Sequence, residues 1–149
     1  MHKVKPPHIF LVCQLLFFGS LVAGCGSHNT LSGSVQLDLA FDTFVASTQG
    51  TQLLLSYTRK AGGKVAQLSY NTEGANLGNG TTVAGSDFLA RAAVSRAMGD
   101  DSAFPDILQG SIYFDRFNMT KGEHLSGTFT MIFVKGSTLN GQFDADIAE

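Results

Sequence analysis

Apolar and polar residues alternate over the last 25 residues or so of the chain, and this pattern constrains the fold more than any other feature. Between residues 128 and 133 the odd-numbered positions are Phe129, Met131 and Phe133. Between residues 139 and 147 they are Leu139, Gly141, Phe143, Ala145 and Ile147. Lys135-Gly136-Ser137 lies between the two segments and is typical of a turn. The pattern predicts a C-terminal β-hairpin with one face in the core.

Similar alternation earlier in the chain predicts further strands. Residues 34–42 alternate with Val35, Leu37, Leu39 and Phe41 on one face. Residues 52–58 and 64–70 flank a glycine-containing turn and form an expected hairpin. Residues 110–118 form another expected strand, and residues 71–85 and 99–105 are expected loops. About seven strands with short turns predict an all-β domain, a small antiparallel sandwich or barrel.

Residues 86–98 have two interpretations. As a strand, the segment places Phe88, Ala90, Ala92, Val94 and Met98 on one face. As a helix capped by Ser86 or Asp87, it groups Leu89, Ala92, Ala93 and Ala97. Its alanines and arginines favour a helix, whereas its β-rich surroundings favour a strand. We expect a strand by a narrow margin.

A short Leu-x-Gly-polar-apolar motif opens four of the expected strands. It occurs at Leu31–Val35, Leu108–Ile112, Leu125–Phe129 and Leu139–Phe143. A glycine near a strand start often marks a bulge or a close approach of neighbouring groups. The irregular spacing excludes a solenoid, so the motif indicates a structural role within one sheet system. These hairpins also resemble those of uncharacterised bacterial lipoproteins, a resemblance that implies an all-β envelope domain but no activity.

The N-terminus has the organisation of a secretory signal peptide. Lys3 and Lys5 precede an apolar run over residues 9–22, and small residues follow it. A transmembrane anchor is the alternative, but this 14-residue run is shorter than the roughly 20 residues that cross a bilayer. We therefore expect residues 1–24 to be removed.

The expected cleavage zone, Val22-Ala23-Gly24-Cys25, resembles the lipobox of bacterial lipoproteins. The resemblance implies cleavage between Gly24 and Cys25 and acylation of the Cys25 thiol. Residues 25–32 would then be a lipidated cysteine and tether, and residues 33–149 a single β domain. Gly26, where enterobacterial inner-membrane lipoproteins tend to carry Asp, implies the outer membrane of the cell envelope. The alternative is an ordinary signal peptide with a chance cysteine.

The amino-acid composition argues against several kinds of partner and cross-link. Only 15% of residues are charged and the formal net charge is −2, so we expect no nucleic-acid partner. The two cysteines, Cys13 and Cys25, fall in the signal and at the lipid, which leaves no disulfide in the mature chain. The numerous phenylalanines favour a packed core over a cavity for an apolar ligand.

Candidate catalytic and metal-binding residues are few. Asp100, Asp101 and Asp106 could offer oxygen ligands to Ca²⁺, although their spacing does not match an EF-hand. Glu123-His124 and the carboxylates Asp38, Asp42, Asp144 and Asp146 are more simply explained as solvated surface residues. The cluster Arg59, Lys60 and Lys64 is expected at a solvated hairpin tip. We expect no enzyme, no cofactor and no required metal.

The sequence therefore predicts a lipid-anchored envelope protein with a non-enzymatic structural or interaction role. Its expected partners are the membrane, through the lipid, and an envelope protein. The alternatives are a binding module for an apolar or glycan ligand, or an inhibitor of an envelope-directed hydrolase. An internal cavity would favour the binding module, whereas a filled core with an exposed strand edge would favour an interaction protein.

Overall fold

The computed structural model describes residues 28–97 and 103–148, which form nine strands and one short helix. The elements are β1 (Thr30–Gly33), β2 (Thr43–Gln49), β3 (Gln52–Thr58), β4 (Lys64–Asn71), β5 (Thr81–Ala84), α1 (Gly85–Leu89), β6 (Ala92–Ala97), β7 (Ile107–Arg116), β8 (His124–Phe133) and β9 (Thr138–Asp146). The expected signal peptide, its cleavage site at Gly24 and Cys25, and the acidic residues Asp100 and Asp101 lie outside the described residues.

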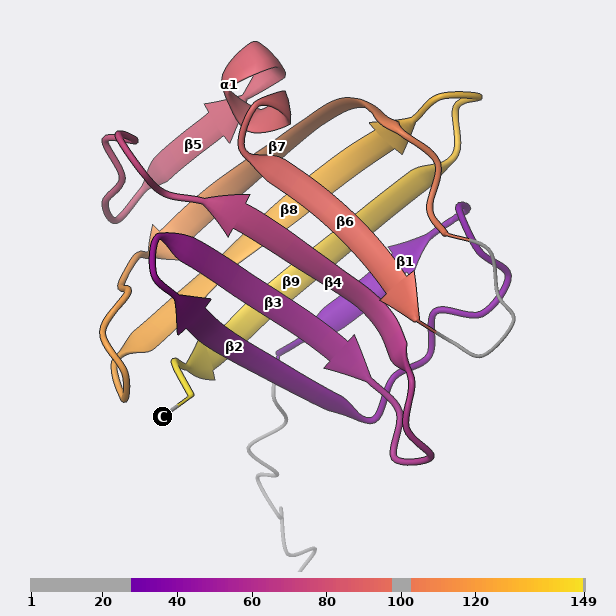
Figure 1. Cartoon of the computed structure of the whole chain (residues 1–149), viewed down its shortest axis with the longest axis horizontal. Helices are drawn as coiled ribbons and strands as arrows, with labels where there is room; N and C mark the ends of the chain where they lie inside the picture. The colour runs from indigo at the N-terminus through magenta and orange to yellow at the C-terminus, as the bar shows by residue number, and fades with distance from the viewer. Residues whose placement is uncertain (1–27, 98–102, 149) are drawn as a thin grey trace, which may run out of the picture.

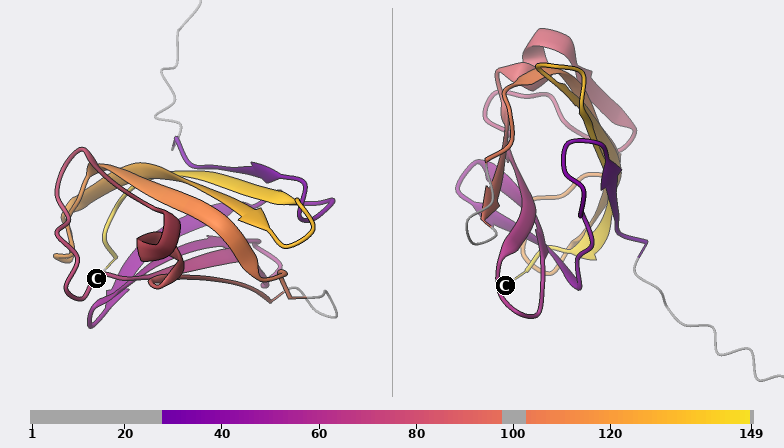
Figure 2. Two further views of the ribbon diagram at one scale, coloured as in Figure 1. Left: turned by 90° about the horizontal axis from the view of Figure 1, so that it is seen from above. Right: turned by 90° about the vertical axis from the view of Figure 1, so that its right-hand side faces the viewer.

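The strands form two antiparallel sheets that stack face to face (Figure 1). One sheet has five strands in the order β1-β9-β8-β7-β5, and the other has four in the order β2-β3-β4-β6. Figure 2 shows the two layers from their edges, with α1 at one end. The chain crosses from the five-stranded to the four-stranded sheet through α1, between β5 and β6. The all-β prediction is confirmed, in the form of a sandwich rather than a barrel and with more strands than expected.

Aromatic side chains dominate the interface between the sheets. Tyr57 and Tyr70 of the four-stranded sheet are fully buried and face Phe114 and Phe129 of the other sheet. The Tyr57 hydroxyl donates a 3.0 Å hydrogen bond to the main-chain oxygen of Gln142 in β9, which joins the two sheets through the core. Burial raises the pKa of the Tyr57 phenol well above its usual value.

The C-terminal hairpin is confirmed as β8 and β9. Its predicted core residues Phe129, Met131, Phe133, Leu139, Phe143 and Ile147 are all buried. The exposed Gln142 and Thr130 lie on the opposite face, as the alternation requires. The hairpin over residues 52–70 is likewise confirmed as β3 and β4.

The recurrent Leu-x-Gly motif explains the packing of this hairpin. Its two copies are antiparallel neighbours, so Gly127 lies opposite Phe143 and Phe129 lies opposite Gly141. A Cβ atom at Gly141 would lie 2.3 Å from two ring carbons of Phe129, and one at Gly127 would lie 2.7 Å from the Phe143 ring. Each glycine therefore makes room for the phenylalanine of the opposite strand. All four copies of the motif start within or beside strands of the five-stranded sheet.

The segment 34–42 is not the strand that its alternation predicted. It is the connection from β1 in one sheet to β2 in the other, and Leu37 is fully exposed while Leu39 is buried. Ser34 and Val35 both donate main-chain hydrogen bonds to the oxygen of Thr138, so the chain turns away from β9 at this point. Alternation alone does not make a strand when no neighbouring strand runs alongside. The strand β1 instead begins at Thr30, within the expected tether.

The middle of the chain also differs from the prediction. The expected loop 71–85 contains β5, which pairs with β7 from Thr81 to Ala84. The ambiguous segment 86–98 divides into both alternatives, the helix α1 followed by the strand β6. Phe88 of α1 is fully buried, and its ring fills the space beside Gly110 of β7. The helix therefore closes one end of the core, while the inward side chains of Ala92 and Val94 continue it along β6.

Candidate functional site: the β6 edge and its groove

Four strands lie at the edges of the two sheets, and they differ in how they are covered. The edge strands β1 and β5 have only four residues each. The edge strand β2 is bridged by the C-terminal segment, because Ala148 donates its amide to the oxygen of Ala46 at 2.8 Å. The six-residue strand β6 pairs with β4 on one side, and no strand among the described residues pairs with its other side.

The hydrogen-bond pattern identifies the open backbone groups of β6. The amide of Asn71 donates to the oxygen of Arg91 at 2.9 Å, which makes these two residues a hydrogen-bonded pair. Hydrogen-bonded and non-hydrogen-bonded pairs alternate in an antiparallel ladder. Ala93 therefore directs its N–H and C=O groups towards β4, and Ala92 and Val94 direct theirs away from the sheet. Unpaired backbone groups of this kind are a template for pairing with another extended chain.

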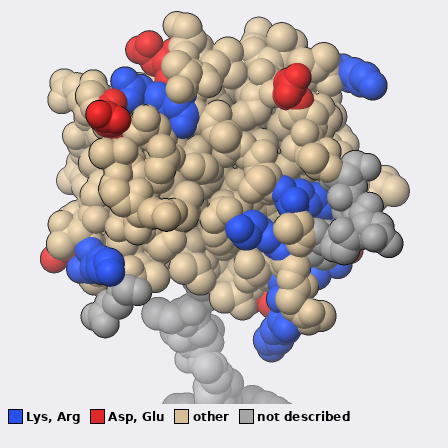
Figure 3. Space-filling model, viewed as in Figure 1, with Lys and Arg blue, Asp and Glu red and all other residues tan. Residues whose placement is uncertain are grey.

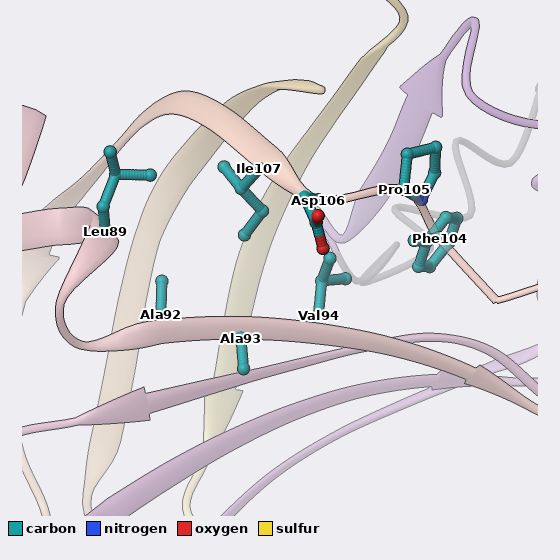
Figure 4. Close-up of a pocket in the computed structure, with 8 residues that line it drawn as sticks. All are labelled: Leu89, Ala92, Ala93, Val94, Phe104, Pro105, Asp106 and Ile107. Carbon is teal, nitrogen blue, oxygen red and sulfur yellow. The ribbon is translucent and has the colours of Figure 1, made fainter. Parts of the chain in front are cut away.

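A groove of about 350 Å³ runs beside this edge. One wall comes from α1 and β6, with Leu89, Ala92 and Val94, and the other comes from residues 104–107 (Figure 4). Figure 4 shows Ala92 and Val94 pointing towards Ile107, whereas Ala93 points away. The Phe104 ring stacks on the buried Phe133 with centroids 5.8 Å apart, which anchors that wall to the core.

Asp106 is the one candidate metal ligand of the acidic loop that the structure describes. Its main-chain oxygen accepts the Val134 amide at 2.9 Å, and its side chain is exposed at the groove. Over residues 28–97 and 103–148, no group of three or more histidine, cysteine, aspartate or glutamate side chains has an arrangement that could hold a metal ion. The groove therefore offers apolar walls and backbone groups, with one carboxylate beside them.

A cluster of polar side chains lies beside the start of β1, where it contacts β8 and β9. The His124 ring lies between two carboxylates of β9, at 3.0 Å from Asp144 and 3.0 Å from Asp146. The other oxygen of Asp144 is 3.5 Å from His28. Asn29 makes two hydrogen bonds with the main chain of Asp144, accepting its amide at 2.7 Å and donating to its oxygen at 3.2 Å. We call this contact the Asn29–Asp144 clamp, and it fixes the start of β1 against β9.

Glu123 is exposed, as expected for a solvated turn, whereas His124 makes contacts that the sequence did not predict. His124 is the first residue of β8, and it contacts the carboxylates that face it across the ladder. The sequence neighbours did not indicate this contact, but the register of the C-terminal hairpin places His124 directly opposite Asp146. The histidines and aspartates contact one another, so a structural role explains why these residues lie together.

The remaining charged candidates also have structural contacts. Arg59 is 2.5 Å from Asp38 and donates to the oxygen of Ala40 at 3.0 Å, so the β3–β4 hairpin holds the 34–42 connection. The Ala40 amide and the Arg59 guanidinium lower the pKa of the Asp38 carboxyl. Asp42 accepts the main-chain amide of Lys60 at 2.9 Å. Arg59 is therefore not merely part of a solvated tip.

Comparison of the chain with family models, with curated proteins and with solved structures found no match. Within the described residues, no helix has the length and apolar character needed to cross a bilayer.

Proposed function

We propose that this chain is a lipid-anchored envelope protein with a non-enzymatic interaction role, and that it captures an extended polypeptide segment at the edge of β6. The observation that carries the proposal is the ladder edge at Ala92 and Val94, which no described strand pairs with, beside a groove lined mostly by apolar side chains and by exposed backbone groups. The packed aromatic core also supports an interaction protein over a carrier of an enclosed apolar ligand.

Strand addition is the binding mode that this geometry favours. A segment running antiparallel to β6 would make main-chain hydrogen bonds with Ala92 and Val94. Every second side chain of that segment would enter the groove and cover Leu89 and Ile107, because side chains alternate along a strand. The added strand would give the smaller sheet five strands, equal to its partner sheet. The expected ligand is therefore an extended segment with an apolar residue at alternate positions.

The sequence supports the envelope location and the anchor. The apolar run over residues 9–22 and the lipobox-like Val22-Ala23-Gly24-Cys25 motif imply export, cleavage before Cys25 and acylation of its thiol. Two or three acyl chains hold a protein firmly at a bilayer, whereas one chain does so only marginally. With Gly26 next to the cysteine, we propose the outer membrane as the location. The captured segment would then belong to another envelope protein.

A peptide-display selection against the full-length chain in detergent tests the proposal. We expect the enriched peptides to carry apolar residues at every second position, since only one face of an added strand meets the groove. Their binding should shift the amide resonances of Ala92 and Val94 in NMR spectra. Enriched peptides without this alternation, or shifts confined to other strands, would contradict the proposal.

Two substitutions at one position separate the backbone contact from the side-chain contact. Val94→Pro removes the outward amide donor and leaves the β4 ladder unaltered, because that amide points away from β4. Val94→Ala keeps the donor and removes only part of the apolar wall. We expect Val94→Pro to abolish peptide binding and Val94→Ala to weaken it. Equal binding by the two variants would exclude strand addition, once circular dichroism has shown that both are folded.

A further inference from the structure

We propose that the outer face of the five-stranded sheet binds a neutral saccharide at a site centred on Tyr113, Thr128 and Gln142. These three residues form one row across β7, β8 and β9, since Tyr113 pairs with Thr128 and Thr128 with Gln142. The site lies on the opposite side of the molecule from the outer face of the four-stranded sheet. It is independent of the β6 edge and goes beyond the proposed interaction role.

The side-chain groups of this row are available for a ligand. Tyr113 is 38% exposed, whereas the other two tyrosines of the chain are fully buried in the core. Among the described residues, the Tyr113 hydroxyl, the Thr128 hydroxyl and the Gln142 amide make no side-chain hydrogen bond. The row therefore offers an exposed ring, a hydroxyl and an amide, which can both donate and accept hydrogen bonds.

The outer face of the four-stranded sheet gives a useful comparison. Two of its amides are bonded to neighbouring hydroxyl groups: Gln67 donates to Ser56 at 3.0 Å, and Gln52 accepts from Ser69 at 2.9 Å. Figure 3 shows this face, where uncharged surface predominates and the charged side chains lie in small scattered groups. Both faces are rich in small polar residues, and the row at Tyr113 combines unbonded polar groups with an exposed aromatic ring.

The row lies in a shallow depression of about 210 Å³. Its lining also includes Gly127 and Phe143, the two acidic residues Asp115 and Asp144, and Ser126. Ser126 donates to Asp115 at 3.3 Å, and His124 holds Asp144 at 3.0 Å, so both carboxylates are oriented by neighbours. The register shift between Phe114 and Arg116 changes the course of β7 beside this depression.

The charges and shape of the depression select the class of ligand. The described residues that line it include two carboxylates and no lysine or arginine, which disfavours phosphate, sulfate and other anions. A saccharide ring presents an apolar C–H face that can lie on an aromatic ring, and hydroxyl groups that can pair with amides and carboxylates. The sheet register fixes the three backbone positions, so only the side-chain rotamers have to be ordered when a ligand binds. A neutral sugar residue of an envelope glycan fits these features.

The test is a titration of the full-length chain in detergent with neutral tetrasaccharides of glucose and of N-acetylglucosamine. We expect at least one of them to bind and to shift the amide resonances of Tyr113, Thr128 and Gln142. Tyr113→Ala and Gln142→Ala should each weaken binding by about tenfold or more, while Tyr113→Phe, which keeps the ring, should lose less. Gln67→Ala removes an amide from the opposite face and should leave binding unchanged.

Because Tyr113 and Gln142 are exposed, we expect these variants to keep the wild-type melting temperature, which shows that any loss of binding is local. Failure of both saccharides to bind would overturn the proposal, as would binding that Tyr113→Ala leaves intact. Tighter binding of dextran sulfate, or of Ca²⁺ without any saccharide, at the same resonances would overturn it as well. Peptide binding at β6 is measured on different resonances, so the two proposals can fail separately.

Discussion

Replacing Gly141 with alanine should destabilise the protein mainly through one contact, the ring of Phe129. The new Cβ would lie 2.3 Å from two carbons of that ring and 3.0 Å from the Tyr57 hydroxyl. Such overpacking of a filled core costs about 1–3 kcal/mol of unfolding free energy. The backbone at Gly141 has no positive φ, so alanine adds no backbone strain there. We therefore expect Gly141→Ala to lower stability by about 2 kcal/mol.

A double-mutant cycle isolates that contact. Phe129→Ala alone should cost about 3–5 kcal/mol, because it leaves a cavity in the core. Once the ring is absent, alanine at position 141 meets mainly the Tyr57 hydroxyl, and part of the cavity is refilled. The double variant should therefore be more stable than the sum of the single effects predicts, by about 1–2 kcal/mol. Urea unfolding at equilibrium, followed by circular dichroism, measures each free energy.

The second glycine of the hairpin provides a matched control. A Cβ at Gly127 would lie 2.7 Å from the Phe143 ring but also 2.0 Å from the main-chain oxygen of Tyr113. Removing the Phe143 ring leaves the backbone contact, so Gly127→Ala should remain costly in a Phe143→Ala background. Additivity within about 0.5 kcal/mol at Gly141 and Phe129 would refute the role we assign to the glycine. Equal coupling at the two glycine–phenylalanine pairs would refute the distinction between them.

Four further predictions concern the anchor, the core and the solution conditions. Cys25→Ala should abolish fatty-acid labelling and leave uncleaved precursor on a gel, and full membrane partitioning of a cleaved mutant would contradict the lipobox. Phe143→Ala should cost about 3–5 kcal/mol in urea unfolding, whereas Gln142→Ala, on the exposed face, should cost less than about 0.5 kcal/mol; similar losses would contradict the face assignment. The folded state keeps the Tyr57 proton at a pH where the unfolded chain loses it, so stability should fall as pH rises above about 10, and Tyr57→Phe should reduce this fall. Melting of the full-length chain should be insensitive to EDTA and to reductant, and a clear drop in melting temperature with EDTA would support a calcium site at the acidic residues between 100 and 106.

The C-terminal hairpin could be predicted because its information is local. Alternation with a period of two sets the buried face, and Lys135-Gly136-Ser137 sets the turn. The Leu-x-Gly motif was predicted to have a structural role, but it also contains information on the register of the strands. Two copies aligned antiparallel, with each glycine opposite a phenylalanine, would have given the register directly.

The segments that the sequence did not predict depend on contacts made far along the chain. Residues 34–42 alternate like a strand, but they connect the two sheets and are held by Arg59 and Thr138. The strand β5 has only four residues, and its pairing with β7 makes it a strand. In the ambiguous segment, the burial of Phe88 against Gly110 stabilises a single helical turn before β6 begins. Local propensity cannot include these tertiary contacts.

The sequence did not predict the candidate sites because they too depend on contacts between distant segments. An open strand edge at Ala92 and Val94 has no side-chain signature, since it consists of backbone groups that no strand pairs with over residues 28–97 and 103–148. The row at Tyr113 joins three strands, and it becomes visible only once the register is known. The first 25 residues predict an exported, lipid-anchored protein, whereas the candidate sites depend on the sheet order.

The Asn29–Asp144 clamp determines how far the domain can move from the membrane under the proposed anchor. Only four Cα–Cα steps separate Cys25 from Asn29, which limits the span between the lipid and the clamp to about 14 Å. If Cys25 carries the proposed lipid, a tether this short would hold the sandwich close to the bilayer surface. Ligands that are themselves fixed to that membrane would meet the domain at a high effective concentration, while those that lie deeper in the envelope would be beyond its reach.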